Sequence, residues 1–217
     1  MKPRFSNQRA IAMTMVEAVV VIALLALLVA MILPTLDHTG RSPRIPCLNN
    51  LKEIGTAYRV WAQDNDDKYP MQVAVKNGGA MELVAAGNVA ACFQVMSNQL
   101  STPKILICPT DTNRIAATNF AIGFNNDNIS YFVGLDADQT NPRMFLSGDD
   151  NFAIGGAPVK SGLLQLWTNA PVTWTAARHK FAGNIGLADG SVYQVNAESL
   201  QQALQQSGVA TNRLAIP

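Results

Sequence analysis

Residues 13–33 read MTMVEAVVVIALLALLVAMIL, an apolar run of 21 residues with one charged side chain, Glu17. As an α-helix this run is about 31 Å long, which matches the hydrocarbon core of a bilayer at about 30 Å. A carboxylate inside a membrane-spanning helix costs on the order of 2.5–3.5 kcal/mol at the centre and less near an end. Glu17 is therefore a candidate functional residue, and a partner for its charge is expected.

The residues before the run indicate both its orientation and a candidate partner. Residues 1–12 hold three basic side chains and no acid, so they are expected to stay in the cytoplasm. A secretory signal has a shorter apolar core, about 7–15 residues, followed by its cleavage site, whereas here the small residue Ala12 precedes the run. Cutting after Ala12 would create an α-amine on Met13, and in a packed helical assembly that amine can pair with Glu17 of a neighbouring copy.

The stretch from Ala12 to Glu17, followed by the apolar run, resembles the processing signal of type IV pilins and type II secretion pseudopilins. In that family a prepilin peptidase cuts after a small residue, usually Gly, and methylates the new N-terminus. The resemblance implies cleavage between Ala12 and Met13, methylation of Met13, and assembly roles for Glu17 and Pro34, residues five and 22 of the processed chain. The alternative is a plain signal anchor in which Glu17 reaches the membrane surface.

The resemblance implies a structural pilin-like subunit of a type II secretion pseudopilus or a type IV pilus, and no enzyme activity. The implied partners are prepilin peptidase, other pilin or pseudopilin subunits, and the bacterial inner membrane. The chain would span that membrane once with its head in the periplasm, and would later join a periplasmic pseudopilus or a surface pilus. Without residues 1–12 the 16 basic and 15 acidic residues become 13 and 15, so no nucleic-acid partner is expected. The other hypothesis is an uncut, signal-anchored periplasmic enzyme or binding module.

We expect three parts: a leader at 1–12, a transmembrane and assembly helix at 13–36, and a periplasmic head at 37–217. Pro43 and Pro46 predict that the first helix is kinked or broken near 37–46. A second helix is expected from Pro46 or Cys47 to about residue 64, because apolar residues there recur at spacings of three and four.

The remainder of the head predicts an antiparallel β-sheet with two further helices, and so an α+β, pilin-like fold. The expected strands are 104–108, 129–135, 144–147, 163–167, 184–188 and 191–195. Asp189-Gly190 between the last two predicts a hairpin with a type I′ turn. The helices are expected at 80–91 and at 197–206, the second capped by Asn196.

The head carries a second resemblance, this time to large-head pseudopilin-like proteins of the planctomycete and verrucomicrobial kind. It rests on the segments that begin at Cys47, Tyr69 and Cys108, and on His179, which is followed by nine residues and then Asp189-Gly190. A His, nine residues and Asp-Gly form the C-terminal signature of those proteins, and the role of the signature is undefined.

The cysteines and the signature histidine leave several interpretations open. Cys47, Cys92 and Cys108 allow one disulfide of unknown pairing with one free thiol, or three reduced cysteines, and their spacings match no zinc pattern. We expect His179 to hydrogen-bond to the Asp189-Gly190 turn and so hold the hairpin. The enzyme hypothesis instead uses His179, oriented by the same aspartate, with Cys108 or a serine as nucleophile.

No metal or cofactor is expected, with calcium as the alternative. The chain offers oxygen ligands of the kind that calcium takes, although no fixed spacing demands a site and such residues usually serve turn chemistry. These acids are Asp136, Asp138, Asp149, Asp150 and Asp189.

Overall fold

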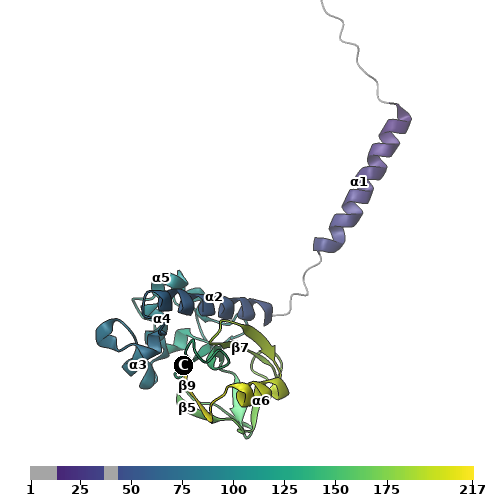
Figure 1. Ribbon diagram of the computed structural model, residues 1–217. Helices are drawn as coiled ribbons and strands as arrows, with labels where there is room; N and C mark the ends of the chain where they lie inside the picture. Colours follow the sequence, from purple (N-terminus) through teal and green to yellow (C-terminus); the bar gives the residue numbers. More distant parts are fainter. Residues whose placement is uncertain (1–13, 37–43) are drawn as a thin grey trace, which may run out of the picture. The chain divides into compact units, whose positions relative to one another are not determined.

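The computed structural model describes residues 14–36 and 44–217 (Figure 1). The predicted leader, the Ala12–Met13 cleavage site and residues 37–43 of the predicted break lie outside the described residues. The chain forms two compact units, Met1–Arg41 and Ser42–Pro217. Within the part of the chain that the structure describes, no helix is long and apolar enough to cross a membrane.

The first unit contains helix α1, Met15–Leu36. Pro34 lies in its last turn, so the helix continues for two residues beyond this proline. In the second unit, α2 spans Arg44–Gln63 and begins slightly earlier than predicted. Pro46 is therefore inside its first turn, where the missing amide costs no helical hydrogen bond.

The helix expected at 80–91 is divided in two. Helices α3, Met81–Ala85, and α4, Val89–Val95, are separated at Gly87, whose φ of +87° is a left-handed conformation that ends a helix. Helix α5, Ser97–Leu100, follows directly. The predicted helix near the C-terminus is confirmed as α6, Ala197–Gln206, and Asn196 caps it by accepting a hydrogen bond from the Ser199 amide.

Within residues 44–217, nine strands make two antiparallel sheets, so the coarse α+β prediction is confirmed. The larger sheet has the order β5-β9-β1-β2-β7-β8, and the smaller has the order β4-β3-β6. The strands are β1 Tyr131–Gly134, β2 Phe145–Asp149, β3 Phe152–Ile154, β4 Ala157–Pro158, β5 Gly162–Trp167, β6 Val172–Trp174, β7 Gly183–Leu187, β8 Val192–Val195 and β9 Thr211–Ile216. Four 3-10 helices complete the head: η1 Pro70–Gln72, η2 Val75–Asn77, η3 Pro103–Leu106 and η4 Asn126–Asn128.

Two sequence-based expectations are wrong, and some strands were not predicted. The strand predicted at 104–108 is largely the 3-10 helix η3, because Pro103 starts a helical turn and the Thr102 hydroxyl accepts a hydrogen bond from the Lys104 amide. Four strands were not predicted from the sequence: β3, β4 and β6, which form the smaller sheet, and β9, which lies between β5 and β1 in the larger sheet. The hairpin turn is not type I′, because Gly190 has a positive φ and Asp189 does not.

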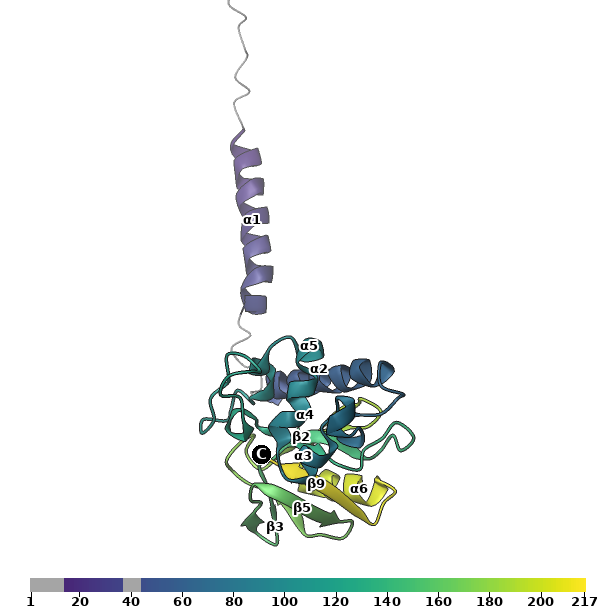
Figure 2. The ribbon, with the colours of Figure 1, turned by 90° about the vertical axis from the view of Figure 1, so that its left-hand side faces the viewer.

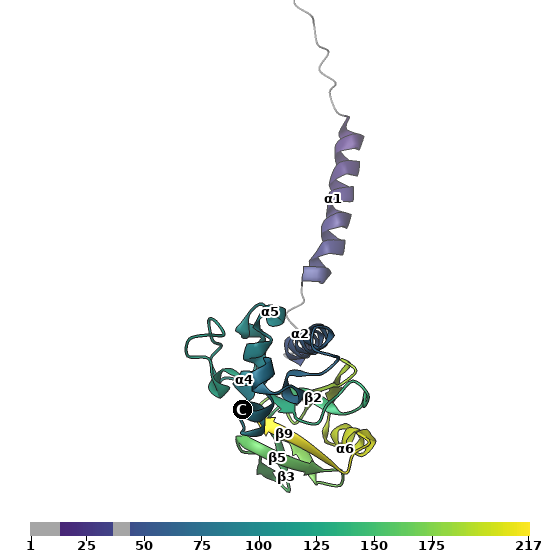
Figure 3. The same cartoon turned by 60° about the vertical axis from the view of Figure 1, so that its left-hand side comes forward.

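Two apolar cores lie on opposite faces of the larger sheet, because successive side chains of a strand point to opposite sides. Tyr131 and Val133 of β1 belong to the first core, which lies under α2 and α4. Phe132 between them belongs to the second core, which lies under α6 and the smaller sheet. Figures 2 and 3 show these layers, with α2, α4 and α5 on one side and α6 and β3 on the other. The head is thus a central sheet covered on both faces.

Replacing Gly183 tests the second core. A Cβ atom at Gly183 would lie 2.3 Å from carbons of the Trp174 ring, so Gly183→Ala should lower the free energy of unfolding by about 1–3 kcal/mol through overpacking. The matched control in the same strand is Gly186→Ala, whose Cβ atom would lie 3.4 Å from its nearest neighbour, and it should cost less than about 1 kcal/mol. Urea denaturation of both variants measures the difference, and equal losses would contradict this packing.

Candidate functional site

A disulfide marks the centre of the candidate site in the head. The structure joins Cys47, near the start of α2, to Cys108, which follows η3, with their Cα atoms 5.1 Å apart. This is the pairing that the sequence left open. Cys92 is a free and buried thiol whose Sγ atom lies 3.2 Å from the Tyr58 hydroxyl. Burial raises the pKa of Cys92 to about 12, so this thiol stays protonated at neutral pH.

The signature histidine lies against this disulfide. Its Nε2 atom is 3.3 Å from Cys108 Sγ and 3.4 Å from Asp149 Oδ2, and its side chain has no solvent-exposed surface. His179, Lys180 and Phe181 have φ angles of +55°, +50° and +60°, which is an unusual run for residues other than glycine. Each such residue costs on the order of 1–3 kcal/mol and persists only where the surroundings enforce it. The chain therefore holds His179 in place at a cost.

Asp149, the last residue of β2, is fully buried beside His179. Its Oδ2 atom accepts hydrogen bonds from the Asn184 amide at 2.7 Å and from Asn184 Nδ2 at 2.8 Å. Burial raises the pKa of Asp149 to about 6, and the Arg178 charge and the Asn184 donors limit the rise. Asp149, and not Asp189, is thus the carboxylate next to the signature histidine.

Charged side chains surround this pair. Arg178 contacts Asp150, lies 3.4 Å from Asp111, and donates a hydrogen bond of 3.1 Å to the Ser130 carbonyl oxygen. A second arginine, Arg114, lies 2.7 Å from Asp150 and 3.2 Å from Asp111. With Asp149 ionised, the three aspartates and two arginines have a formal charge of −1.

The Asp189-Gly190 part of the signature lies at a different place. Asp189 accepts hydrogen bonds from the Ser191 amide and hydroxyl at 2.8 and 2.5 Å, within the four residues, 188–191, that connect β7 to β8. The Gly190 amide donates to the Leu187 carbonyl, and the Leu187 amide donates to the Ser191 carbonyl, a pattern of a type I turn followed by a glycine bulge. The expected hydrogen bond from His179 to this turn is therefore wrong, since the described contacts of His179 are with Cys108 and Asp149.

The fixed spacing of the signature follows from the strand between its two ends. His179 precedes β7 and Asp189 follows it, and the five residues of β7 span about 17 Å as an extended strand. The turn instead packs on α2, where a Cβ atom at Gly190 would lie 2.9 Å from the Arg59 guanidinium. The Tyr69 hydroxyl donates a hydrogen bond of 2.7 Å to the Ala188 carbonyl beside the turn. The signature thus joins the buried cluster to the contact between α2 and the hairpin.

The acids considered for calcium have protein partners of their own. Asp136 pairs with Arg213, Asp138 accepts hydrogen bonds from the Thr140 amide at 2.7 Å and from Asn141, and Asp150 pairs with arginines. Among residues 14–36 and 44–217, Asp149 is the one acid of this set that joins a group with metal-ligand geometry. Calcium at the other positions stays a prediction.

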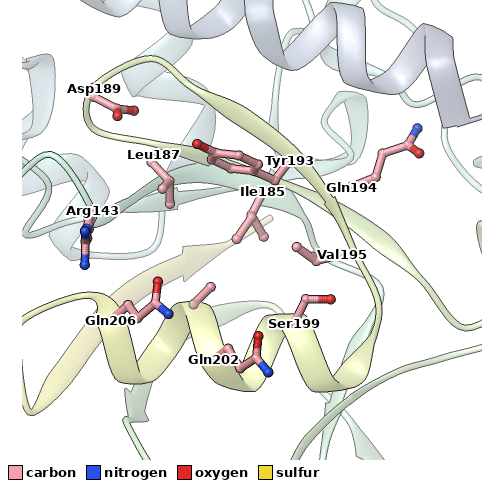
Figure 4. A pocket seen from close by; sticks show the side chains of 11 residues that line it. Arg143, Ile185, Leu187, Asp189, Tyr193, Gln194, Val195, Ser199, Gln202 and Gln206 are labelled. Atoms are coloured by element: carbon pink, nitrogen blue, oxygen red, sulfur yellow. The ribbon is translucent and has the colours of Figure 1, made fainter.

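A groove of about 520 Å³ lies between the β7–β8 hairpin and α6. Figure 4 shows Tyr193 and Asp189 on the hairpin facing Gln202 and Gln206 on the helix. The groove is lined mainly by neutral polar and apolar side chains, and His179 is not among them. Of the residues of the enzyme hypothesis, the groove therefore contains Asp189 but neither His179 nor Cys108.

The geometry of the enzyme hypothesis is wrong in two respects. Cys108 is disulfide-bonded, so it has no thiol to act as nucleophile. Asp189 is bonded within its own turn, and the imidazole of His179 is closed off from solvent.

Glu17 has a local partner at the start of α1. Its carboxylate accepts hydrogen bonds from the Thr14 amide at 2.8 Å and from the Thr14 hydroxyl at 3.0 Å. The Thr14 hydroxyl in turn accepts one from the Glu17 amide at 3.3 Å. This reciprocal pair is a capping box. A Thr followed three residues later by Glu before an apolar run is the sequence signal of this motif, and it was not among the sequence-based predictions.

Comparison of the chain with protein-family models, with curated proteins and with solved structures finds no match.

Replacing Asp149 should change how stability depends on pH. Because the pKa of Asp149 is raised from 3.8 to about 6, the folded chain binds this proton more tightly than the unfolded chain does. The stabilisation that comes from protonated Asp149 is therefore fully present below about pH 4, and it is lost as the pH rises through about 6. The free energy of unfolding of the wild type minus that of Asp149→Asn should therefore fall by about 3 kcal/mol between these limits. Urea denaturation across the pH range measures it, and a constant difference would contradict the raised pKa.

Proposed function

We propose that the chain is a structural, pilin-like subunit of a type II secretion pseudopilus or a type IV pilus. The observation that carries the proposal is the single carboxylate of Glu17 in the first turn of an otherwise apolar helix. Its position four residues after the Ala12–Met13 peptide supports processing by a prepilin peptidase. The 21-residue apolar run supports insertion into the inner membrane, with the head in the periplasm.

During assembly the apolar helix would move from the lipid of the membrane to contacts with the helices of other subunits. The basic leader holds the N-terminus in the cytoplasm, and the peptidase removes it and methylates Met13. The helices then leave the lipid and pack on one another, which keeps their apolar surfaces out of water. The described side chains of the α1 run from Met15 to Val29 are mostly exposed in the isolated chain, as is expected of a helix that packs on lipid or on other subunits.

The capping box gives Glu17 a defined position before assembly. Both oxygen–donor contacts with Thr14 involve Oε2, which leaves Oε1 able to accept a further hydrogen bond. The α-amine of Met13 on a neighbouring subunit would supply the opposite charge. Thr14 thus acts as a positioning residue, and the ion pair between subunits supplies the compensation that a carboxylate among packed helices needs.

Processing is tested by the intact mass and N-terminal sequence of the protein isolated from membranes that contain an active prepilin peptidase. The expected chain begins at N-methyl-Met13. A chain that keeps Met1 would contradict the proposal and favour a permanently anchored periplasmic protein. A catalytically inactive peptidase is the control, and it should leave residues 1–12 attached.

The role of Glu17 is tested by comparing Glu17→Gln with Thr14→Ala. Glu17→Gln removes the negative charge but keeps a hydrogen-bond acceptor for the Thr14 amide, whereas Thr14→Ala removes the capping hydroxyl, worth about 1 kcal/mol, and keeps the charge. Glu17→Gln should lower fibre yield at least tenfold with normal membrane insertion, and Thr14→Ala should change the yield much less. Equal losses in the two variants would indicate that Glu17 serves only as a cap.

A further inference from the structure

We propose that Cys47, Cys108, His179 and Asp149 form a binding site for Zn²⁺ when the Cys47–Cys108 disulfide is reduced. One candidate ligand atom from each of these four buried side chains lies within 4.8 Å of the other three. Two thiolates, an imidazole and a carboxylate are donor types that zinc takes, and four ligands complete a structural site. This inference goes beyond the proposed subunit role and does not depend on it.

The distances within the cluster suit a tetrahedral ion. With zinc–ligand bonds of about 2.3 Å to sulfur and about 2.0–2.1 Å to nitrogen and oxygen, neighbouring S and N ligands lie about 3.5 Å apart, and N and O ligands about 3.3 Å apart. The structure has 3.3 Å between Cys108 Sγ and His179 Nε2, and 3.4 Å between His179 Nε2 and Asp149 Oδ2. The imidazole and carboxylate are therefore already at ligand spacing.

The remaining adjustment is the separation of the two sulfur atoms, to about 3.8 Å in a tetrahedral site. The Cα atoms of the two cysteines are 5.1 Å apart, so rotation of their side chains can open that distance once the S–S bond is broken. A dithiol reductant supplies the two electrons and two protons and is itself oxidised to a disulfide. Zn²⁺ then displaces the two thiol protons as it binds.

The surroundings compensate the charge of such a site. Two thiolates, one carboxylate and Zn²⁺ sum to a charge of −1, and the buried Arg178 guanidinium lies 4.0 Å from Asp149 Oδ1. Asn184 donates two hydrogen bonds to Asp149 Oδ2, the oxygen that lies 3.4 Å from His179 Nε2, and outer partners of this kind orient metal ligands. The left-handed run at 179–181 holds the imidazole against the cysteines. Because the site is buried, metal is expected to enter as the chain folds.

The test uses the full-length protein in detergent, reduced with dithiothreitol without oxygen, freed of reductant, and titrated with Co²⁺ as a spectroscopic substitute for Zn²⁺. The expected result is one Co²⁺ per chain with thiolate-to-cobalt charge-transfer absorption, which one equivalent of Zn²⁺ removes. The oxidised protein should not develop this absorption. Reduced, folded protein that fails to bind Co²⁺ with this absorption would overturn the proposal.

Variants identify the ligands. Cys108→Ser should abolish the charge-transfer absorption, and Asp149→Asn should weaken Co²⁺ binding by more than the 10–100-fold that loss of an outer partner typically costs. Cys92→Ser is the matched control, because Cys92 is a buried cysteine outside the cluster, and it should bind Co²⁺ as the wild type does. Unchanged binding in Cys108→Ser would overturn the assignment.

A reduced protein that unfolds is also informative. If reduction abolishes the near-ultraviolet circular dichroism, one equivalent of Zn²⁺ should restore it, because binding to a site formed only in the folded chain drives folding. Failure of Zn²⁺ to restore the signal would overturn the proposal.

Discussion

The head depends on the link between α2 and the sheet at the Cys47–Cys108 disulfide. The two cysteines are 61 residues apart in sequence, and closing a loop of that length lowers the entropy of the unfolded chain by the equivalent of about 4 kcal/mol. Asn50 adds hydrogen bonds from α2 to the Ile107 carbonyl at 3.1 Å and to the Tyr131 hydroxyl at 3.3 Å. The helix, the η3 segment and strand β1 are thus tied together at one point, and the first core closes around it.

That junction is costly as well as stabilising. The charged side chains of the cluster lose their hydration when they are buried. Removing one partner of a buried ion pair typically lowers the free energy of unfolding by about 3–5 kcal/mol, because the other charge is left uncompensated. The left-handed run at 179–181 adds backbone strain. A simple apolar contact would join α2 to the sheet without these costs. The cluster therefore holds buried charge and backbone strain that an apolar contact would not.

The spacing between His179 and Asp189 is explained by architecture. Strand β7 lies between them. His179 therefore lies in the buried cluster before the strand, and the Asp189-Gly190 turn lies against α2 after it. Cys47 and Gly55 both belong to α2, and Gly55 lies so close to Gly190 that an added Cβ atom would be 3.7 Å from the Gly190 Cα atom. Segments that carry the second resemblance therefore hold α2 on the sheet at two places.

The sequence by itself determined the features that depend on neighbours in the chain. These are the apolar run with Glu17, the amphipathic stripe of α2, the β7–β8 hairpin and the Asn196 cap, since periodicity and capping act over a few residues. Only the tertiary structure decided the cysteine pairing, the aspartate beside His179, the central place of β9 and the 3-10 form of residues 103–106. Each of these rests on contacts between segments far apart in the chain, and local patterns do not specify which distant segments meet.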